Sequence, residues 1–139
     1  MNKIIKKIKF LLFSIVLSTV SFYSTYLFAL SSDWVVNDKS KVRLISSKTN
    51  SDNLDIIYLG LEYQLDPEWK TYWKSPGGGG FPQKILWNNS ENISNLNIEW
   101  PTPKQFEILG LTSIGYEDNV IFPIELSIID KNKITKINL

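Results

Sequence analysis

The chain has 139 residues, with 15 Lys and Arg residues against 14 Asp and Glu residues, and its composition is 43% hydrophobic and 13% aromatic. It contains no Cys and no His. These absences exclude a structural disulfide and a thiol or histidine nucleophile–base pair, and they remove the usual zinc and haem ligands. Four of the basic residues lie among the first nine positions, so the remainder is slightly acidic, which argues against a nucleic-acid surface.

Residues 1–29 have the pattern of an export signal. Lys3, Lys6, Lys7 and Lys9 form a basic start, and residues 10–30 then contain no charge. A basic region, an apolar stretch and a small residue near the end are typical of a secretory signal peptide. Serines and threonines dilute the apolar run, so we favour a cleaved signal peptide over an uncleaved membrane anchor, which remains the alternative. Either interpretation places residues 30–139 outside the cytoplasm as one domain.

The pattern of this domain is two-residue alternation, which predicts strands with one buried face. Residues 57–65 and 120–128 are the longest such runs, and Pro123 within the second predicts that this strand lies at a sheet edge or is bulged. Shorter strands are expected at 42–46, 71–74, 84–87, 96–100 and 134–139.

Turn residues separate these strands. Residues 66–68 fit a tight turn around Pro67, residues 76–82 form a glycine-rich loop, and residues 117–119 make a polar reversal. Short strands separated by turns, without a helical stripe, predict an all-β fold, an antiparallel immunoglobulin-like β-sandwich. Because the sequence ends within an apparent strand, we expect the sandwich to be incomplete at its C-terminus.

Three aromatic residues cluster at Trp69, Tyr72 and Trp73. If these side chains are exposed, they would stack on sugar rings or bind a peptide. If they are buried, they would form part of the core, and we favour a core position for at least one of the two tryptophans. The four glycines at 77–80 lack the Gly-Lys-Ser/Thr sequence of a phosphate-binding loop, so a structural turn is the better interpretation. The carboxylates form no evident acid–base pair, so no catalytic residue and no metal ligand is predicted.

Several blocks, taken in order, resemble the N-terminal periplasmic domain of DsbD-type thiol:disulfide interchange proteins, also described as disulfide bond corrector domains. The most specific is Pro-x-Trp-Lys-Thr-Tyr-Trp-x-Ser-Pro-Gly at 67–77. The others are Trp-x₅-Ser-x-Val-Arg-Leu at 34–44, Gly-x-Glu at 60–62, Trp-Pro-x-Pro at 100–103 and a Gly-Tyr-x₃-Val-x-x-Pro element within 112–123.

The resemblance implies a periplasmic immunoglobulin-like module that relays reducing equivalents to thiol proteins and supports cytochrome c maturation. Its partners would be periplasmic thiol–disulfide proteins or a membrane electron-carrier domain. No cofactor and no nucleic acid is expected, and the chain would contact the membrane only through an uncleaved leader. In such a family the cysteine pair lies beyond the Gly-Tyr block, so no catalytic residue carries over and the chain alone is expected to be inactive in disulfide exchange.

The residual role expected from the resemblance is partner docking. The residues predicted to contact the partner are Trp69, Tyr72, Trp73, Gly78, Gly79, Phe81 and Tyr116. A second hypothesis is a secreted, non-redox module that binds carbohydrate or peptide through exposed aromatics, and a third is a membrane-tethered structural module.

Overall fold

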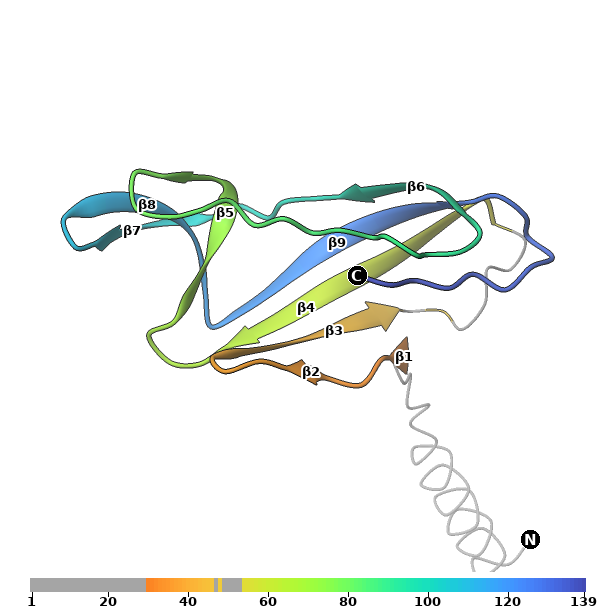
Figure 1. The fold of residues 1–139 in the computed structure, drawn as a ribbon, viewed down its shortest axis with the longest axis horizontal. Coiled ribbons are helices and arrows are strands. Elements are labelled where there is room, and N and C mark those ends of the chain that lie inside the picture. The colour runs from red at the N-terminus through yellow and green to blue at the C-terminus, as the bar shows by residue number, and fades with distance from the viewer. Residues whose placement is uncertain (1–29, 47, 49–53) are drawn as a thin grey trace, which may run out of the picture.

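The computed structural model describes residues 30–46, 48 and 54–139, and the predicted export signal at 1–29 lies outside these residues. The described part is all-β, and its strands pair antiparallel in two sheets that pack as a sandwich (Figure 1). The strands are β1 (Leu30–Ser31), β2 (Val35–Val36), β3 (Ser40–Ser46), β4 (Ile56–Leu65), β5 (Lys70–Gly77), β6 (Ile93–Ile98), β7 (Lys104–Ile108), β8 (Leu111–Glu117) and β9 (Asn119–Ile128).

The larger sheet has the order β1-β3-β4-β9-β6, with β2 also paired to β3, and the smaller sheet has the order β5-β8-β7. Strand β8 passes directly into β9 through Asp118, so one continuous segment connects the two sheets. Figure 1 shows the smaller sheet at one end of the molecule, on the left, while β1 and the C-terminal segment lie away from that end.

The two long strands predicted from alternation are confirmed as β4 and β9, which pair with each other. Leu61 lies opposite Phe122, and both side chains are buried, whereas Tyr58 and Ile121 point to the exposed face. Alternation identifies these strands because successive side chains of a strand point to opposite faces of the sheet.

The position of Pro123 corrects the prediction of an edge or a bulge. Strand β9 is paired on both sides, by β4 and by β6, and its register with β4 is continuous through the Gly60–Pro123 pair. The carbonyl of Pro123 accepts a hydrogen bond from Glu99 N (2.8 Å), just past the last paired residue of β6. Because the nitrogen and carbonyl of one strand residue point to the same side, the missing N–H faces the place where the β6 ladder ends.

The core lies between the sheets around Phe122, whose ring is fully buried. The rings of Tyr63, Trp100 and Tyr116 meet it edge-on, with centroids 5.5, 5.3 and 5.1 Å from its own. Such edge-to-face pairs add to the free energy gained by burying apolar area. The aromatic composition thus provides the centre of a core that contains no disulfide.

Two short predicted strands are wrong. Residues 84–87 form no strand, although Ile85 and Trp87 do pack against the core. Residues 134–139 form no named strand either, and this segment is attached through one isolated bridge between Glu91 and Lys136. Residues 96–100 are strand only to Ile98 within β6, while 42–46 and 71–74 are confirmed within β3 and β5.

Asn92 ties the start of β6 to the segment after β9. Its side-chain amide donates to Asp130 O (2.8 Å), Lys133 O (3.2 Å) and Thr135 Oγ1 (3.1 Å), and its carbonyl oxygen accepts from Asp130 N (2.9 Å). Its φ of 62° lies in the left-handed region, which Asn tolerates better than most residues.

We expect Asn92→Ala to lower the free energy of unfolding by about 2–3 kcal/mol, because two backbone carbonyls and one N–H lose their partner and Ala is strained at this φ. Urea denaturation measures the change, with Asn95→Ala on the exposed part of β6 as the matched control. A loss for Asn92→Ala no larger than that of the control would contradict a structural role of the amide.

Candidate functional site

The glycine-rich loop after β5 lies directly on strand β8. Gly78 N donates to Thr112 O at 2.9 Å. A Cβ added at Gly79 would overlap the hydroxyl of Ser113 and lie 3.2 Å from Leu111 Cβ, and one added at Gly80 would overlap the ring of Tyr72. Glycine is therefore required because the backbone approaches its neighbours closely, which agrees with the interpretation of this loop as structural.

The hydroxyl of Ser113 is buried beneath this loop. The Ser113 side chain has no exposed area, and its hydroxyl has no hydrogen-bond partner among the described residues. After the loop, Gln83 fixes the chain to β5, because its Nε2 donates to Tyr72 O at 2.5 Å. The loop is thus held to β5 and β8 by contacts at both ends.

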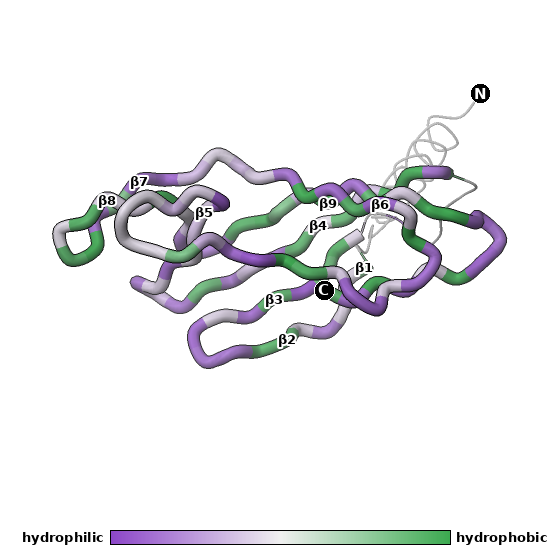
Figure 2. The backbone as a smooth tube through the Cα atoms, turned by 45° about the horizontal axis from the view of Figure 1, so that its top comes forward, coloured by the Kyte–Doolittle hydropathy of each residue, from purple (hydrophilic) through white to green (hydrophobic). Residues whose placement is uncertain are grey.

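Beside the loop, the hairpin between β7 and β8 carries an apolar end. Ile108 and Leu111 pair across a two-residue turn in which Leu109 has φ 50° and Gly110 has φ 79°. Two consecutive positive φ values define a turn that favours Asn, Asp or Gly at its first position, so Leu109 is an unusual occupant. Figure 2 shows that this hairpin ends in hydrophobic residues.

Three apolar side chains at this end of the small sheet are exposed: Phe81 at 88%, Leu109 at 98% and Leu111 at 51%. We call these three residues the apolar tip. Gly79, which precedes Phe81 by two residues, lies against Leu111, so the glycine loop and the hairpin form one surface. Clustered exposed apolar side chains on a folded domain are typical of an interaction site.

A charged group lies further along the same sheet. Glu117 accepts a hydrogen bond from Lys104 Nζ at 2.7 Å, and Lys70 Nζ lies 3.8 Å from the other carboxylate oxygen. The hydrogen bond and the charge of Lys104 hold the pKa of Glu117 below its usual value, and Glu117 in turn raises the pKa of Lys104. Lys104 and Glu117 therefore stay charged at neutral pH.

The predicted aromatic cluster is divided by the fold. Trp69 is 51% exposed and precedes β5, with Lys39 Nζ 5.8 Å from its ring, whereas the glycine loop follows β5. Strand β5 lies between them, with a register shift between Tyr72 and Gly77. Trp73 packs against the core, as favoured for at least one of the two tryptophans, and the Tyr72 ring lies 6.5 Å from that of Phe106.

Tyr116 is predicted from the sequence to contact a partner, but its side chain is only 5% exposed in the structure. Its hydroxyl donates to Pro101 O at 2.8 Å, and burial raises the pKa of that hydroxyl. Tyr116 therefore belongs to the core and not to the exposed surface. Of the predicted set, the structure brings Tyr72, Gly78, Gly79 and Phe81 together around the loop.

Sequence reasoning missed Leu109 and Leu111. A usable signal was present, because Ile-Leu-Gly-Leu at 108–111 places a glycine between apolar residues where a hairpin turn has to form. Within the described residues, no three His, Cys, Asp or Glu side chains are grouped to hold a metal ion, and no helix is both long and apolar enough to cross a membrane. The arrangement is suited to binding another molecule and presents no nucleophile paired with a base.

Comparisons with known proteins give two matches. The family model described as "Thiol:disulfide interchange protein DsbD, N-terminal" matches residues 41–139. The crystal structure of the N-terminal periplasmic domain of ScsB from Proteus mirabilis is similar at 35% sequence identity, with a TM-score of 0.62 over 74% of this chain. The match covers 41% of the ScsB chain, so the present chain spans about two fifths of that structure. A search of curated proteins gave no match.

Proposed function

The chain belongs to the family of the N-terminal domain of the thiol:disulfide interchange protein DsbD, and from this we propose that it is a periplasmic module that docks partner proteins of thiol–disulfide exchange through its apolar tip. The family match and the similarity to a periplasmic domain of ScsB support this assignment. The partner class is a periplasmic protein with a reactive thiol or disulfide.

Docking, and not electron transfer, is the role proposed for these 139 residues. Disulfide exchange requires a thiolate that attacks a disulfide sulfur, and the sequence contains no Cys. The relay of reducing equivalents and the support of cytochrome c maturation are accordingly proposed for the system in which this module takes part. The residues present contribute recognition of the protein that carries the thiols.

The observation that carries the proposal is the exposure of the apolar tip. Leu109 is 98% exposed at a positive φ, so this residue gains no core burial and its backbone conformation is unfavourable for Leu. Both costs are offset if Leu109 enters a pocket of a partner, because burying a Leu side chain contributes about 1.5–3 kcal/mol. Phe81 adds the kind of aromatic anchor that dominates many interfaces.

Charged residues lie on the same small sheet as the tip. Lys104 and Glu117 form an ion pair of 2.7 Å at the end of the β7–β8 ladder that lies away from the Leu109–Gly110 turn. A partner that extends from the tip along this sheet would meet these charges, and such charges set orientation and association rate more than affinity. The carbohydrate-binding alternative is not supported, because Trp69 and the glycine loop lie at opposite ends of β5 and form no row of stacking rings.

The test is the binding of a periplasmic thioredoxin-like protein with a Cys-x-x-Cys site to the exported chain, measured by isothermal titration calorimetry. We expect Leu109→Asn combined with Phe81→Ser to weaken binding at least about 10-fold, since each removed anchor contributes roughly 1 kcal/mol or more. Asn favours the left-handed conformation at position 109, so the variant should fold as well as the parent chain.

Leu86→Ser is the control, because Leu86 is also an exposed leucine, at 61%, but lies outside the tip. Equal weakening by the control and the tip variant would show that binding responds to general surface hydrophobicity. Undiminished binding of the tip variant would remove the apolar tip as the docking surface, and absence of binding by the parent chain would reject the proposed partner class.

A further inference from the structure

A buried hydroxyl on the central strand of the small sheet lacks the partner that such groups normally have. Ser113 lies on β8, between β5 and β7, and its side chain has no exposed area. Within the described part of the chain its hydroxyl makes no hydrogen bond. Buried polar groups in folded proteins are usually hydrogen-bonded, and one without a partner costs the free energy of its desolvation. The glycine loop that covers Ser113 therefore closes at a cost.

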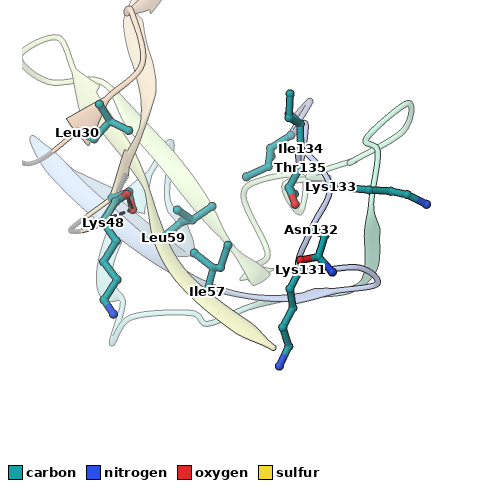
Figure 3. A pocket seen from close by; sticks show the side chains of 11 residues that line it. Leu30, Lys48, Ile57, Leu59, Lys131, Asn132, Lys133, Ile134 and Thr135 are labelled. Carbon is teal, nitrogen blue, oxygen red and sulfur yellow. Dashed lines mark hydrogen bonds between the residues drawn. The ribbon is translucent and has the colours of Figure 1, made fainter. Parts of the chain in front are cut away.

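The charged side chains beside a cleft elsewhere in the molecule have the partners that Ser113 lacks. This cleft has a volume of about 540 Å³ and lies between β4, at Ile57 and Leu59, and the segment 131–137. Lys133 Nζ lies 3.4 Å from a carboxylate oxygen of Asp130, and Figure 3 shows the Lys133 side chain pointing away from the space. The buried hydroxyl on β8 has no comparable partner.

Few hydrogen bonds hold the glycine loop in place. Gly78 N donates to Thr112 O, and Gln83 Nε2 donates to Tyr72 O. Among the described residues, the backbone N–H and C=O groups of residues 79–87 have no hydrogen-bond partner. Glycines also lose more conformational freedom on ordering than other residues do. A segment with so few hydrogen bonds opens locally, at a small fraction of the free energy of global unfolding.

The position of this loop also determines whether the apolar tip is complete. Phe81 directly follows the four glycines, whereas Leu111 belongs to β8. Gly79 is the point of closest approach, because a Cβ added there would overlap the Ser113 hydroxyl and lie 3.2 Å from Leu111 Cβ. The closed loop thus buries Ser113 and at the same time brings the segment that carries Phe81 against the hairpin.

From these observations we propose that the glycine loop is a lid over Ser113, and that only its closed state presents the complete apolar tip. In the open state the Ser113 hydroxyl returns to water, which offsets the contacts that the loop loses. A partner that binds Phe81 together with the hairpin binds the closed state alone, so it shifts the loop toward closure. This control of the tip rests on the docking role proposed above, whereas the lid itself does not.

Native-state hydrogen exchange measures the lid without a partner. The Gly78 amide is the reporter, because its bond to Thr112 O lies next to Ser113. With the full chain purified after export, we expect this amide to exchange at least about 100-fold faster than the slowest amides of β4 and β9. Its rate should respond little to low urea concentrations, because a local opening exposes little surface. A response as steep as that of β4 and β9 would assign the exchange to global unfolding and overturn the lid.

Ser113→Ala isolates the contribution of the hydroxyl. The methyl side chain needs no hydrogen-bond partner, so the closed state is favoured and exchange at Gly78 should slow at least about fivefold. Ser94→Ala is the control, because Ser94 is exposed and its hydroxyl donates to Ser127 O at 3.2 Å, and this variant should leave exchange at Gly78 unchanged. Unchanged or faster exchange in Ser113→Ala would show that the hydroxyl does not oppose closure.

Gly79→Ala tests whether closure of the lid completes the tip. Its Cβ would overlap the Ser113 hydroxyl and lift the loop, whereas the Cβ of Gly78→Ala would lie at an ordinary 3.8 Å from Thr112 O. We expect Gly79→Ala to speed exchange of the residue 78 amide about 10-fold or more, and to weaken binding of the thioredoxin-like partner about fivefold or more. Gly78→Ala should do neither. Equal effects of the two variants, or faster exchange with undiminished binding, would overturn control of the tip by the lid.

The lid and the docking role fail in different experiments. Absence of binding by the parent chain would reject the docking role and with it the control of the tip, while the exchange of the Gly78 amide would still decide whether the loop opens. Where the partner binds, saturation should slow that exchange about 10-fold or more, since a partner that binds only the closed state depletes the open one. Unchanged exchange in the saturated complex would overturn the coupling.

Discussion

Phe122→Ala is expected to lower the free energy of unfolding by about 4 kcal/mol, one of the two largest effects of a single substitution in this domain. Truncating a buried Phe typically costs 3–5 kcal/mol, through lost burial and the cavity that remains. Phe122 has no exposed area, and its ring also contacts three other aromatic rings edge-on. The total stability of a domain is about 5–15 kcal/mol, so a large fraction would be lost.

Urea denaturation followed by tryptophan fluorescence measures this effect, because Trp100 contacts the Phe122 ring. Ile121→Ala is the matched control, since Ile121 is the preceding residue of β9 and its side chain is 45% exposed on the opposite face. We expect a cost of about 1 kcal/mol or less for the control. Similar costs for the two variants would mean that the sandwich core is not centred on Phe122.

Gly115→Ala is expected to disrupt the small sheet, at a cost of about 3 kcal/mol. A Cβ at this position would overlap the carbonyl oxygen of Thr71 and lie 2.9 Å from the Cα of Tyr72. These are backbone atoms of β5, so no side-chain rotation relieves the overlap, and β5 has to move away from β8. The glycine loop follows β5, so we also expect binding at the apolar tip to weaken.

Hydrogen exchange of the β5 amides locates this damage, which should appear as faster exchange in Lys70–Gly77 with little change in β4 and β9. The control is Gly110→Ala at the hairpin turn, where a Cβ would meet no atom within 4 Å but the φ is 79°. Its cost comes only from backbone conformation, about 1 kcal/mol. A Gly115→Ala variant as stable as this control would show that β5 and β8 are not packed as closely as the structure indicates.

The sequence predicted the parts of the fold in which local pattern and tertiary environment agree. Strands β4 and β9 were found because one face of each packs toward the core, fully buried over much of β9 and partly buried along most of β4, so apolar residues recur at every second position. The strand predicted at 84–87 is wrong because Ile85 and Trp87 pack against the core from a segment that forms no strand. Alternation reports burial of side chains and does not report backbone pairing.

The candidate site was predicted only in part, for a related reason. The sequence predicts a glycine-rich loop and a group of aromatic residues, but it does not predict which of the aromatic rings is buried in the core. Trp73 packs on the core while Trp69 stays half exposed, although the two lie four residues apart. Leu109 was missed because an exposed leucine becomes informative only when its exposure and its positive φ are known.

The sequence by itself determined that the domain is all-β, that it belongs among DsbD-like N-terminal domains, and that its own side chains provide no thiol for disulfide exchange. Each of these follows from residue type and order along the chain. The tertiary structure alone decided that Pro123 is tolerated in a central strand, that the apolar tip is exposed, and that a cleft lies between β4 and Ile137. These features depend on contacts between segments far apart in the chain, which local periodicity does not encode.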